Sequence, residues 1–297
     1  MLRLLALLRS PYFLMILPPL FWAGNAIVGR AVVGEIPPIA LSFWRWSLGL
    51  AILLPFGLPR LLPEMGIVRR RWPLLVALAV TSVSAYNSFL YVAVQTTTAI
   101  NATLVGTSLP VVTMLLSWLW LGERGSWRQT AGMAVSLGGV VLVIAQGDPA
   151  GLLALEGRPG DLWMLAATVC WAVYSVLLRR HPPGMDPIAL LTALIAIGLV
   201  FITPFYLYEL ATGPGFAVTP RSLAVLGYVA TFPSLLAYYF WNRGVAVLGA
   251  GLTSQYTYLV PVFAAGLATV LLGEEFRWFH AAGLLLIFSG IWWAGRR

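Results

Sequence analysis

Long apolar runs alternate with short polar connections along the whole chain. Several of the runs reach the ~20 residues that an α-helix needs to cross the hydrocarbon core of a bilayer. The ten runs cover approximately residues 12–32, 39–56, 72–94, 99–121, 128–145, 161–178, 188–208, 223–241, 250–272 and 278–295. Most connections between them are short and contain Pro, Gly or Arg. This pattern predicts an all-α integral membrane protein with ten transmembrane helices.

Composition agrees with a membrane protein and argues against a soluble one. Of the 297 residues, 60% are hydrophobic and 9% are charged, whereas an ordinary soluble domain has about 25% charged residues. So few charges cannot cover the surface of a soluble core. The first run is too long for the apolar part of a signal peptide and contains Trp22, Asn25 and Arg30, so we expect a retained helix.

The basic residues indicate the orientation of the chain. All eighteen are Arg, and nearly all of them lie in the connections. Thirteen fall on one side of the predicted membrane: Arg3, Arg9, Arg60, Arg69, Arg70, Arg71, Arg124, Arg128, Arg179, Arg180, Arg243, Arg296 and Arg297. Four fall on the other: Arg30, Arg158, Arg221 and Arg277. Because cytoplasmic loops are enriched in basic residues, both termini are predicted to be cytoplasmic, in a bacterial inner (plasma) membrane. Nucleic-acid binding is not expected, because no polar domain carries a basic stripe.

The two halves of the chain resemble each other. Trp22-Ala23 recurs as Trp171-Ala172, and the segment 38–41 recurs as 187–190, both at a spacing of 149 residues. Farther along, the spacing is 151. It relates Pro110-Val111 to Pro261-Val262 and Leu121-Gly122-Glu123 to Leu272-Gly273-Glu274. The predicted organisation is a first five-helix repeat over 1–146, a linker over 147–160 and a second repeat over 161–297. An odd number of helices per repeat inverts the second copy, an arrangement that recurs among transporters.

These motifs resemble the EamA-type members of the drug/metabolite transporter superfamily. The resemblance rests on Arg45, on Pro110 and Pro261 with the Leu-Gly-Glu segments that follow them, and on the Gly-rich fifth and tenth runs. Within that superfamily, the chain is similar to the YddG-type exporters of aromatic amino acids. The resemblance implies a central cavity lined by helices 1–4 and 6–9, with helices 5 and 10 at the periphery.

Polar and aromatic residues recur at spacings of three, four and seven, which places them on one face of each helix. The candidate substrate-binding residues are Trp22, Asn25, Asn87, Tyr91, Thr107, Trp163, Trp171, Tyr174, Tyr238, Gln255 and Tyr258. Structural roles compete with binding, because hydroxyl groups in membrane helices often bond to backbone and aromatic rings form interfacial belts. Buried amides bind either substrate or a neighbouring helix. Pro110 and Pro261 are candidate hinge or gating positions, although each is equally consistent with a static kink.

Three charged positions carry separate expectations. Arg45 lies inside the second run and is either a ligand for an anion or a residue anchored at a helix end; the sequence favours the structural role. Glu123 and Glu274 each follow a helix end and are expected to be helix-end anchors or gate contacts.

Residues that are absent from the runs exclude other classes of function. No Asp or Glu lies in the middle of a run, so we expect transport without proton movement through a membrane carboxylate. His181 and His280 are predicted in or beside connections, and no cluster suits a metal or acid–base catalysis. No Walker motif is present. A lone Cys170 excludes a disulfide framework. The chain is therefore predicted to be no enzyme and to need no cofactor or metal.

The leading hypothesis is a secondary transporter that exports small neutral or zwitterionic metabolites, foremost aromatic amino acids, by alternating access through a central uncharged cavity. One alternative is a flippase or carrier for a lipid-linked or anionic solute that uses Arg45. Another is a noncatalytic membrane scaffold. The expected partners are a small-molecule substrate, the lipid bilayer, and a second copy bound through helices 5 and 10.

Overall fold

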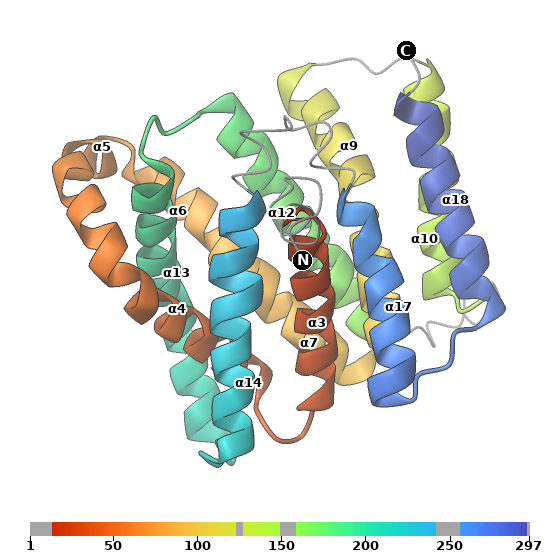
Figure 1. Cartoon of the computed structure of the whole chain (residues 1–297). Helices are drawn as coiled ribbons and strands as arrows, with labels where there is room; N and C mark the ends of the chain where they lie inside the picture. The colour runs from red at the N-terminus through yellow and green to blue at the C-terminus, as the bar shows by residue number, and fades with distance from the viewer. Residues whose placement is uncertain (1–13, 123–126, 149–158, 242–255, 296–297) are drawn as a thin grey trace, which may run out of the picture.

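The computed structural model describes residues 14–122, 127–148, 159–241 and 256–295. Its helices stand side by side (Figure 1). The first half contains α3 (Leu17–Ala31), α4 (Pro38–Leu61), η1 (Leu62–Glu64), α5 (Met65–Arg70), α6 (Trp72–Ala79), η2 (Val80–Ala85), α7 (Tyr86–Thr96), α8 (Ala99–Gly106), α9 (Leu109–Leu121) and α10 (Trp127–Ile144). The second half contains α12 (Pro159–Arg180), α13 (Pro187–Thr212), α14 (Pro220–Ala230), η3 (Thr231–Leu236), η4 (Tyr256–Tyr258), α17 (Leu259–Leu272) and α18 (Trp278–Gly295).

The helical membrane fold is confirmed, because each apolar run predicted from the sequence overlaps at least one of these helices. Among the described residues, six helices are long and apolar enough to cross a membrane, and three further apolar helices are shorter. The number of ten spans stays a prediction.

The second helix is longer than the sequence pattern predicted. It was expected to end at Phe56, but α4 continues to Leu61 and leads through η1 into α5, which ends at Arg70. The apolar pattern is interrupted at Gly57, Pro59 and Arg60, whereas the helix continues through these residues. Arg60 also donates a hydrogen bond from Nη1 to the Phe56 carbonyl at 2.8 Å, which satisfies one backbone acceptor in this stretch.

Two irregularities repeat between the halves. The π-helical segments η2 and η3 lie 151 residues apart, the spacing found for the sequence motifs of this region. Helix 4 is interrupted between α8 and α9, and at the equivalent position of helix 9 the 3₁₀ segment η4 precedes α17. Irregular turns of this kind mark functional positions in many membrane helices.

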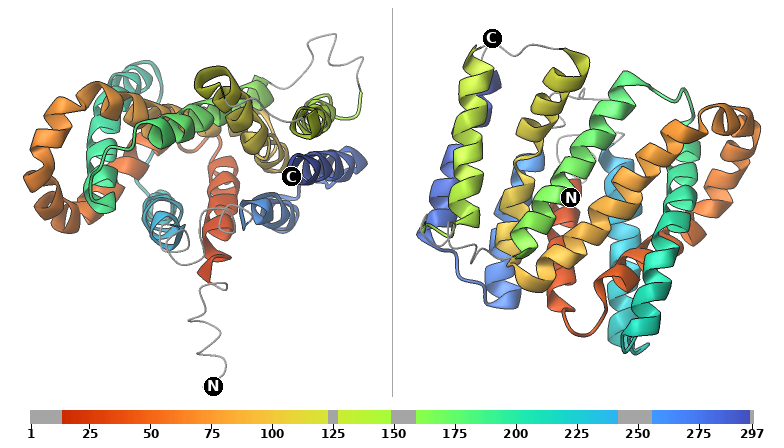
Figure 2. Two further views of the ribbon diagram at one scale, coloured as in Figure 1. Left: turned by 90° about the horizontal axis from the view of Figure 1, so that it is seen from above. Right: turned by 180° about the vertical axis from the view of Figure 1, so that it is seen from behind.

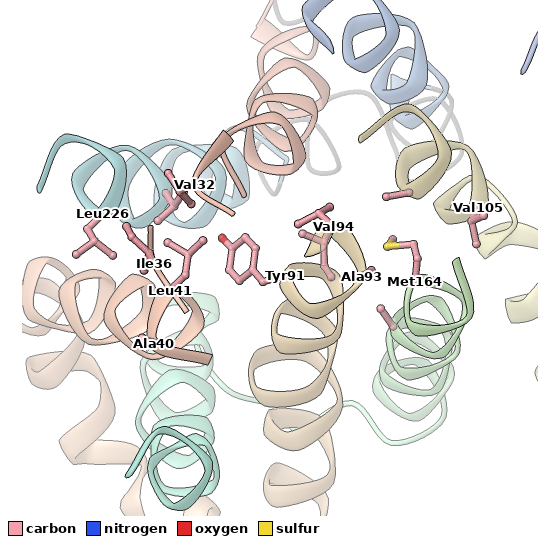
Figure 3. Packing of buried hydrophobic residues seen from close by; sticks show 14 of the residues in the cluster. Val32, Ile36, Ala40, Leu41, Tyr91, Ala93, Val94, Val105, Met164 and Leu226 are labelled. Atoms are coloured by element: carbon pink, nitrogen blue, oxygen red, sulfur yellow. The ribbon is translucent and has the colours of Figure 1, made fainter. Parts of the chain in front are cut away.

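Helices of the two halves pack against each other in pairs. The main pairs are α4 with α13, α7 with α12, α3 with α17, and α10 with α18. The α10–α18 pair lies at one edge of the molecule and the α4–α13 pair at the other (Figure 2). Apolar clusters occupy much of the core between them, and Figure 3 shows Tyr91 between Leu41 and Val94 in one of these clusters.

The glycines of α10 and α18 serve contacts within the chain. A Cβ added at Gly139 would lie 2.8 Å from the Gly283 carbonyl oxygen, and one at Gly290 would lie 2.4 Å from the Gly132 carbonyl oxygen. A homodimer through helices 5 and 10 stays a proposal, and it would have to use other faces of these two helices.

Candidate functional site

Arg45 is the centre of a buried polar cluster formed by Asn25, Arg45, Tyr91 and Ser234. Its side chain is only 3% exposed. Arg45 donates from Nη1 to Asn25 Oδ1 at 2.7 Å and to the Tyr91 hydroxyl at 2.9 Å, and from Nε to Ser234 Oγ at 2.7 Å. The Tyr91 hydroxyl in turn donates to Asn25 Oδ1 at 2.7 Å. The polar cluster therefore joins α3, α4, α7 and η3.

Local sequence explains why Ser234 reaches Arg45. Pro233 lies inside a helix and has no N–H to give to the preceding turn. Ser234 Oγ donates instead to the Val229 carbonyl at 2.7 Å, and Trp22 Nε1 donates to the Pro233 carbonyl at 3.2 Å. The π-helical turn thus keeps its backbone acceptors satisfied while Ser234 accepts from Arg45.

A glycine on α3 permits the close approach of Tyr91. A Cβ added at Gly29 would lie 2.9 Å from Tyr91 Cδ1. Only a residue without a side chain leaves room for the ring there.

All of the hydrogen-bond acceptors around Arg45 are neutral. No carboxylate of the described residues forms an ion pair with it. The guanidinium carbon lies 5.0 Å from the ring centroid of Trp46 and 6.0 Å from that of Tyr91, so the faces of these rings add cation–π attraction. A buried cation is costly in a membrane, and here neutral oxygens and rings compensate part of that cost.

A second cluster is aromatic and consists of Tyr86, Trp171, Tyr174 and Tyr238. The ring centroid of Trp171 lies 4.8 Å from that of Tyr86, 5.2 Å from that of Tyr174 and 6.3 Å from that of Tyr238. Tyr174 and Tyr238 pack against an apolar cluster that contains Trp46, whose ring centroid lies 5.0 Å from the Arg45 guanidinium carbon. The aromatic cluster therefore adjoins the polar cluster.

Of the residues predicted from the sequence, Asn25 and Tyr91 lie in the polar cluster, and Trp171, Tyr174 and Tyr238 lie in the aromatic cluster. These five come from four helical segments and from both halves of the chain.

Other predicted residues have partners outside the two clusters. Trp22 packs against Trp241 at 5.3 Å between ring centroids. Asn87 donates from Nδ2 to the Ser82 carbonyl of its own helix at 3.4 Å. Trp163 is 42% exposed, and its ring centroid lies 5.0 Å from that of Phe89. Gln255 lies outside the described residues, as does the side chain of Tyr258.

Both candidate hinge prolines lie close after a helix interruption. Thr107 and Ser108 separate α8 from α9, and their hydroxyls donate to the Leu104 and Val105 carbonyls at 2.6 and 2.7 Å. Pro110 follows at the second position of α9. Pro261 lies near the start of α17, directly after η4. Hinge motion at these positions stays a prediction.

The structure also contains a buried polar network that the sequence did not predict. His280 was expected in or beside a connection, and it lies beside one, at the third position of α18, where it is 4% exposed. Its Nδ1 accepts from the Arg277 N–H at 3.0 Å, so Nε2 is the nitrogen that donates to Asn101 Oδ1 at 2.9 Å. Asn101 Nδ2 donates to Asp161 Oδ2 at 3.4 Å, and the Thr97 hydroxyl donates to the other Asp161 oxygen.

Acidic residues bind the starts of two helices. Glu274 accepts hydrogen bonds from the Ala99 and Ile100 N–H groups at 2.8 and 3.1 Å, a helix-end contact of the kind expected from the sequence. Glu209 accepts from the Ile39 and Ala40 N–H groups at 3.1 and 2.6 Å. Glu123 lies outside the described residues.

The sequence analysis did not predict that Arg45 is the centre of a polar cluster, and it did not single out Ser234. Arg45 was expected to be either an anion ligand or a helix-end anchor, with the structural role favoured, and it bonds to side chains from three other helical segments. A Pro-Ser pair inside an apolar run was the available signal for Ser234, because such a pair leaves polar groups to be satisfied in a membrane. In the described part of the chain, no three His, Cys, Asp or Glu side chains are grouped as a metal would require.

The comparison with known proteins agrees with this architecture. The model of the EamA-like transporter family matches residues 9–145 and, a second time, residues 158–296. The chain belongs to the EamA-like transporter family. As an EamA-like protein with several apolar helices, it is a multi-pass membrane transporter.

Proteins similar to this EamA-like chain are found in several organisms. An uncharacterized transporter of Archaeoglobus fulgidus is 28% identical over 95% of this chain and 96% of its own length. The aromatic amino acid exporter YddG of Ancylobacter novellus is 27% identical over 84% of this chain and 85% of its own length. A solved crystal structure with 26% sequence identity covers 96% of this chain and 97% of that chain, with a TM-score of 0.63.

Proposed function

We propose that this EamA-like transporter is a secondary carrier that exports small neutral or zwitterionic metabolites, foremost aromatic amino acids, by alternating access. The observation that carries the proposal is that the polar cluster around Arg45 adjoins the aromatic cluster around Trp171, because Trp46 lies against Arg45 and shares an apolar cluster with Tyr174 and Tyr238. An aromatic amino acid has the matching chemistry, with a polar end and a ring. The name of the relative from Ancylobacter novellus supports the same substrate class.

The two halves contribute different chemistry to this site. At the repeat spacing of 149, Asn25 corresponds to Tyr174 and Arg45 corresponds to Leu194. The first half thus supplies most of the polar groups, and the second half supplies three of the four rings of the aromatic cluster. Such a division favours a solute whose two ends differ.

The aromatic cluster can discriminate between solutes. An aromatic pair contributes about 0.5–1.5 kcal/mol beyond the area that it buries. Two such contacts would favour an aromatic over an aliphatic solute by about tenfold. A charged solute side chain would find no opposite charge among these rings and would be disfavoured.

A second candidate is a carrier or flippase for an anionic or lipid-linked solute. It is favoured by one observation, the lack of a described carboxylate paired with Arg45. A noncatalytic scaffold remains the alternative from another class, and solute flux would exclude it. For either carrier we propose residence in a bacterial inner membrane with both termini cytoplasmic, which the bias of Arg between the connections supports.

Competition for flux in proteoliposomes tests the proposal. Phenylalanine, tyrosine and tryptophan should compete with labelled phenylalanine better than alanine does, and far better than glutamate or lysine. Equal competition by alanine would show that the aromatic cluster serves packing only. Absence of flux for every solute would contradict a carrier of this class.

A further inference from the structure

We infer that Arg45 binds the carboxylate of the substrate and that the substrate's amino group is dispensable. The carrier would then also accept aromatic carboxylates without an amino group, such as 3-phenylpropionate and aromatic 2-oxo acids. This inference rests on the proposed function and assigns recognition of the substrate's carboxylate to one residue, Arg45.

Some N–H groups of the Arg45 guanidinium make no hydrogen bond to the described residues. The guanidinium carries five N–H groups. The Nε proton and the two Nη1 protons account for its three hydrogen bonds, to Ser234, Asn25 and Tyr91. Nη2, with two further N–H groups, makes no hydrogen bond to any residue that the structure describes. A carboxylate placed against Nη2 would complete the fork of donors that arginine presents to planar anions.

The charge of Arg45 is also uncompensated within the described part of the chain. Its hydrogen-bond partners are an amide oxygen and two hydroxyls, which are neutral. Bonds from a guanidinium to a carboxylate are about twice as strong as bonds between neutral groups. A substrate anion is therefore the partner that would stabilise this buried cation most.

The described residues of the two clusters include no carboxylate that could pair with the substrate's ammonium group. The buried and half-buried carboxylates of the described residues bind elsewhere. Glu209 and Glu274 bind helix starts, Glu64 binds the Asp186 N–H, the Asp186 carboxylate binds the start of α13, and Asp161 binds Thr97 and Asn101. Among the described residues of the two clusters, an ammonium would meet neutral oxygens and ring faces, and it would be repelled by Arg45. Removal of the amino group should therefore cost little binding, and removal of the carboxylate should cost much.

Competition among three solutes with one ring tests this asymmetry. Against labelled phenylalanine in proteoliposomes, 3-phenylpropionate should compete within about threefold of phenylalanine. Phenethylamine, which lacks the carboxylate, should compete at least about tenfold less, as expected for the loss of a charge-assisted hydrogen bond. Equal competition by phenethylamine and 3-phenylpropionate would overturn the inference, whereas phenylalanine flux would still support the carrier.

Two variants separate substrate binding from a structural role of Arg45. Asn25→Asp places a carboxylate where Asn25 Oδ1 already accepts from Arg45 Nη1, so the internal pair should displace the substrate's carboxylate. Competition by 3-phenylpropionate should fall at least about tenfold while that by phenethylamine is kept or improved. Arg45→Lys keeps the charge but loses the fork, so it should weaken 3-phenylpropionate selectively. A purely structural Arg45 would lower the competition of both solutes equally.

Binding of the two solutes to the purified protein tests the inference even where no flux is detected or the variants do not fold. A ligand that binds the folded state raises the melting temperature, so 3-phenylpropionate should raise it for the unmodified chain and phenethylamine should not. If 3-phenylpropionate raises the melting temperature but no solute is transported, the proposed carrier is contradicted and the role of Arg45 is supported. Shifts of equal size for both solutes would overturn that role, even where the variants fail to fold.

Discussion

The hydroxyl of Tyr91 serves two partners at once, because it accepts from Arg45 and donates to Asn25. We predict that Tyr91→Phe, which keeps the ring in place, lowers the free energy of unfolding by about 1–3 kcal/mol, since it leaves buried polar groups short of a partner. Denaturant unfolding in detergent measures the change. The control Tyr239→Phe alters a 56% exposed residue outside the polar cluster and should have no effect.

The rings of the aromatic cluster should govern substrate preference more than stability. We predict that Trp171→Ala or Tyr238→Ala reduces competition by aromatic amino acids by about tenfold, the value of two aromatic contacts, with little loss of inserted protein. Trp163→Ala is the matched control, because Trp163 packs against Phe89 outside the cluster. If Trp163→Ala has the larger effect on competition, the recognition site lies nearer Phe89 than Trp171.

Helical spacing singled out Asn25, Tyr91, Trp171 and Tyr238, which lie in the two clusters, since each repeats with other polar or aromatic residues on one face of its helix; their role in binding stays a prediction. Helical spacing did not indicate the cluster around Arg45. A sequence gives the depth of a residue along its own helix, but it does not give the side chains that neighbouring helices bring to that depth. For the same reason the network of His280, Asn101 and Asp161 was not predicted.

At the level of helices, carboxylates from the second half bind the N-terminal ends of two helices of the first half. Glu274 binds the start of α8, and Glu209 binds the start of α4. Both contacts match the negative charge of the carboxylate to the positive end of the helix dipole. Each also tethers one half of the molecule to the other.

We predict that Glu274→Gln loosens the start of α8. Loss of a helix cap costs about 1 kcal/mol, which corresponds to about fivefold in a local opening equilibrium. Maleimide labelling of Ala102→Cys, in a background without Cys170, should speed up by that factor, because Ala102 is only 1% exposed in the closed helix.

Glu275→Gln provides the control for that experiment. Glu275 is adjacent in sequence, but its carboxylate binds the exposed Arg277 and no helix start. Equal acceleration in both variants would attribute the effect to lost charge and not to the cap.

The α10–α18 pair depends on direct contact of its backbones. We predict that Gly290→Ala destabilises the protein by about 1–3 kcal/mol, the usual range for overpacking, because the new Cβ would lie 2.4 Å from the Gly132 carbonyl oxygen. Gly138→Ala is the control on the partner helix, where an added Cβ meets nothing within 4 Å. Thermal unfolding of the two variants compares them; equal stability would mean that the helices separate at no cost.

The sequence predicted the location of the helices more reliably than their irregular turns and their ends. Apolar length indicated where the helices lie, whereas the π-helical segments and the continuation of α4 to α5 leave no trace in hydrophobic periodicity. The interruption of helix 4 was signalled only by Pro110. Its actual location depends on Thr107 and Ser108, whose hydroxyls bind carbonyls of the preceding turn.

For the whole molecule we predict flux without proton movement. No carboxylate of the described residues lies beside Arg45 or the aromatic cluster, and the buried Asp161 lies near the start of α12 with Thr97 and Asn101 as partners. In proteoliposomes, a substrate gradient alone should drive transport, and a protonophore should leave its rate unchanged. If flux instead vanishes without a pH gradient, Asp161→Asn would show whether this carboxylate carries the proton.

The difference between the two halves has a kinetic consequence. In a carrier made of two identical inverted copies, the inward-open and outward-open states would be equivalent in energy, and half-saturation would occur at the same substrate concentration on either face. Here Arg45 and Asn25 have the apolar or aromatic Leu194 and Tyr174 as counterparts, so that equivalence is lost. The empty carrier should rest mainly on one side, and the half-saturating concentrations at the two faces should differ. Because a passive carrier cannot pump, the maximal rates in the two directions must then differ by the same ratio.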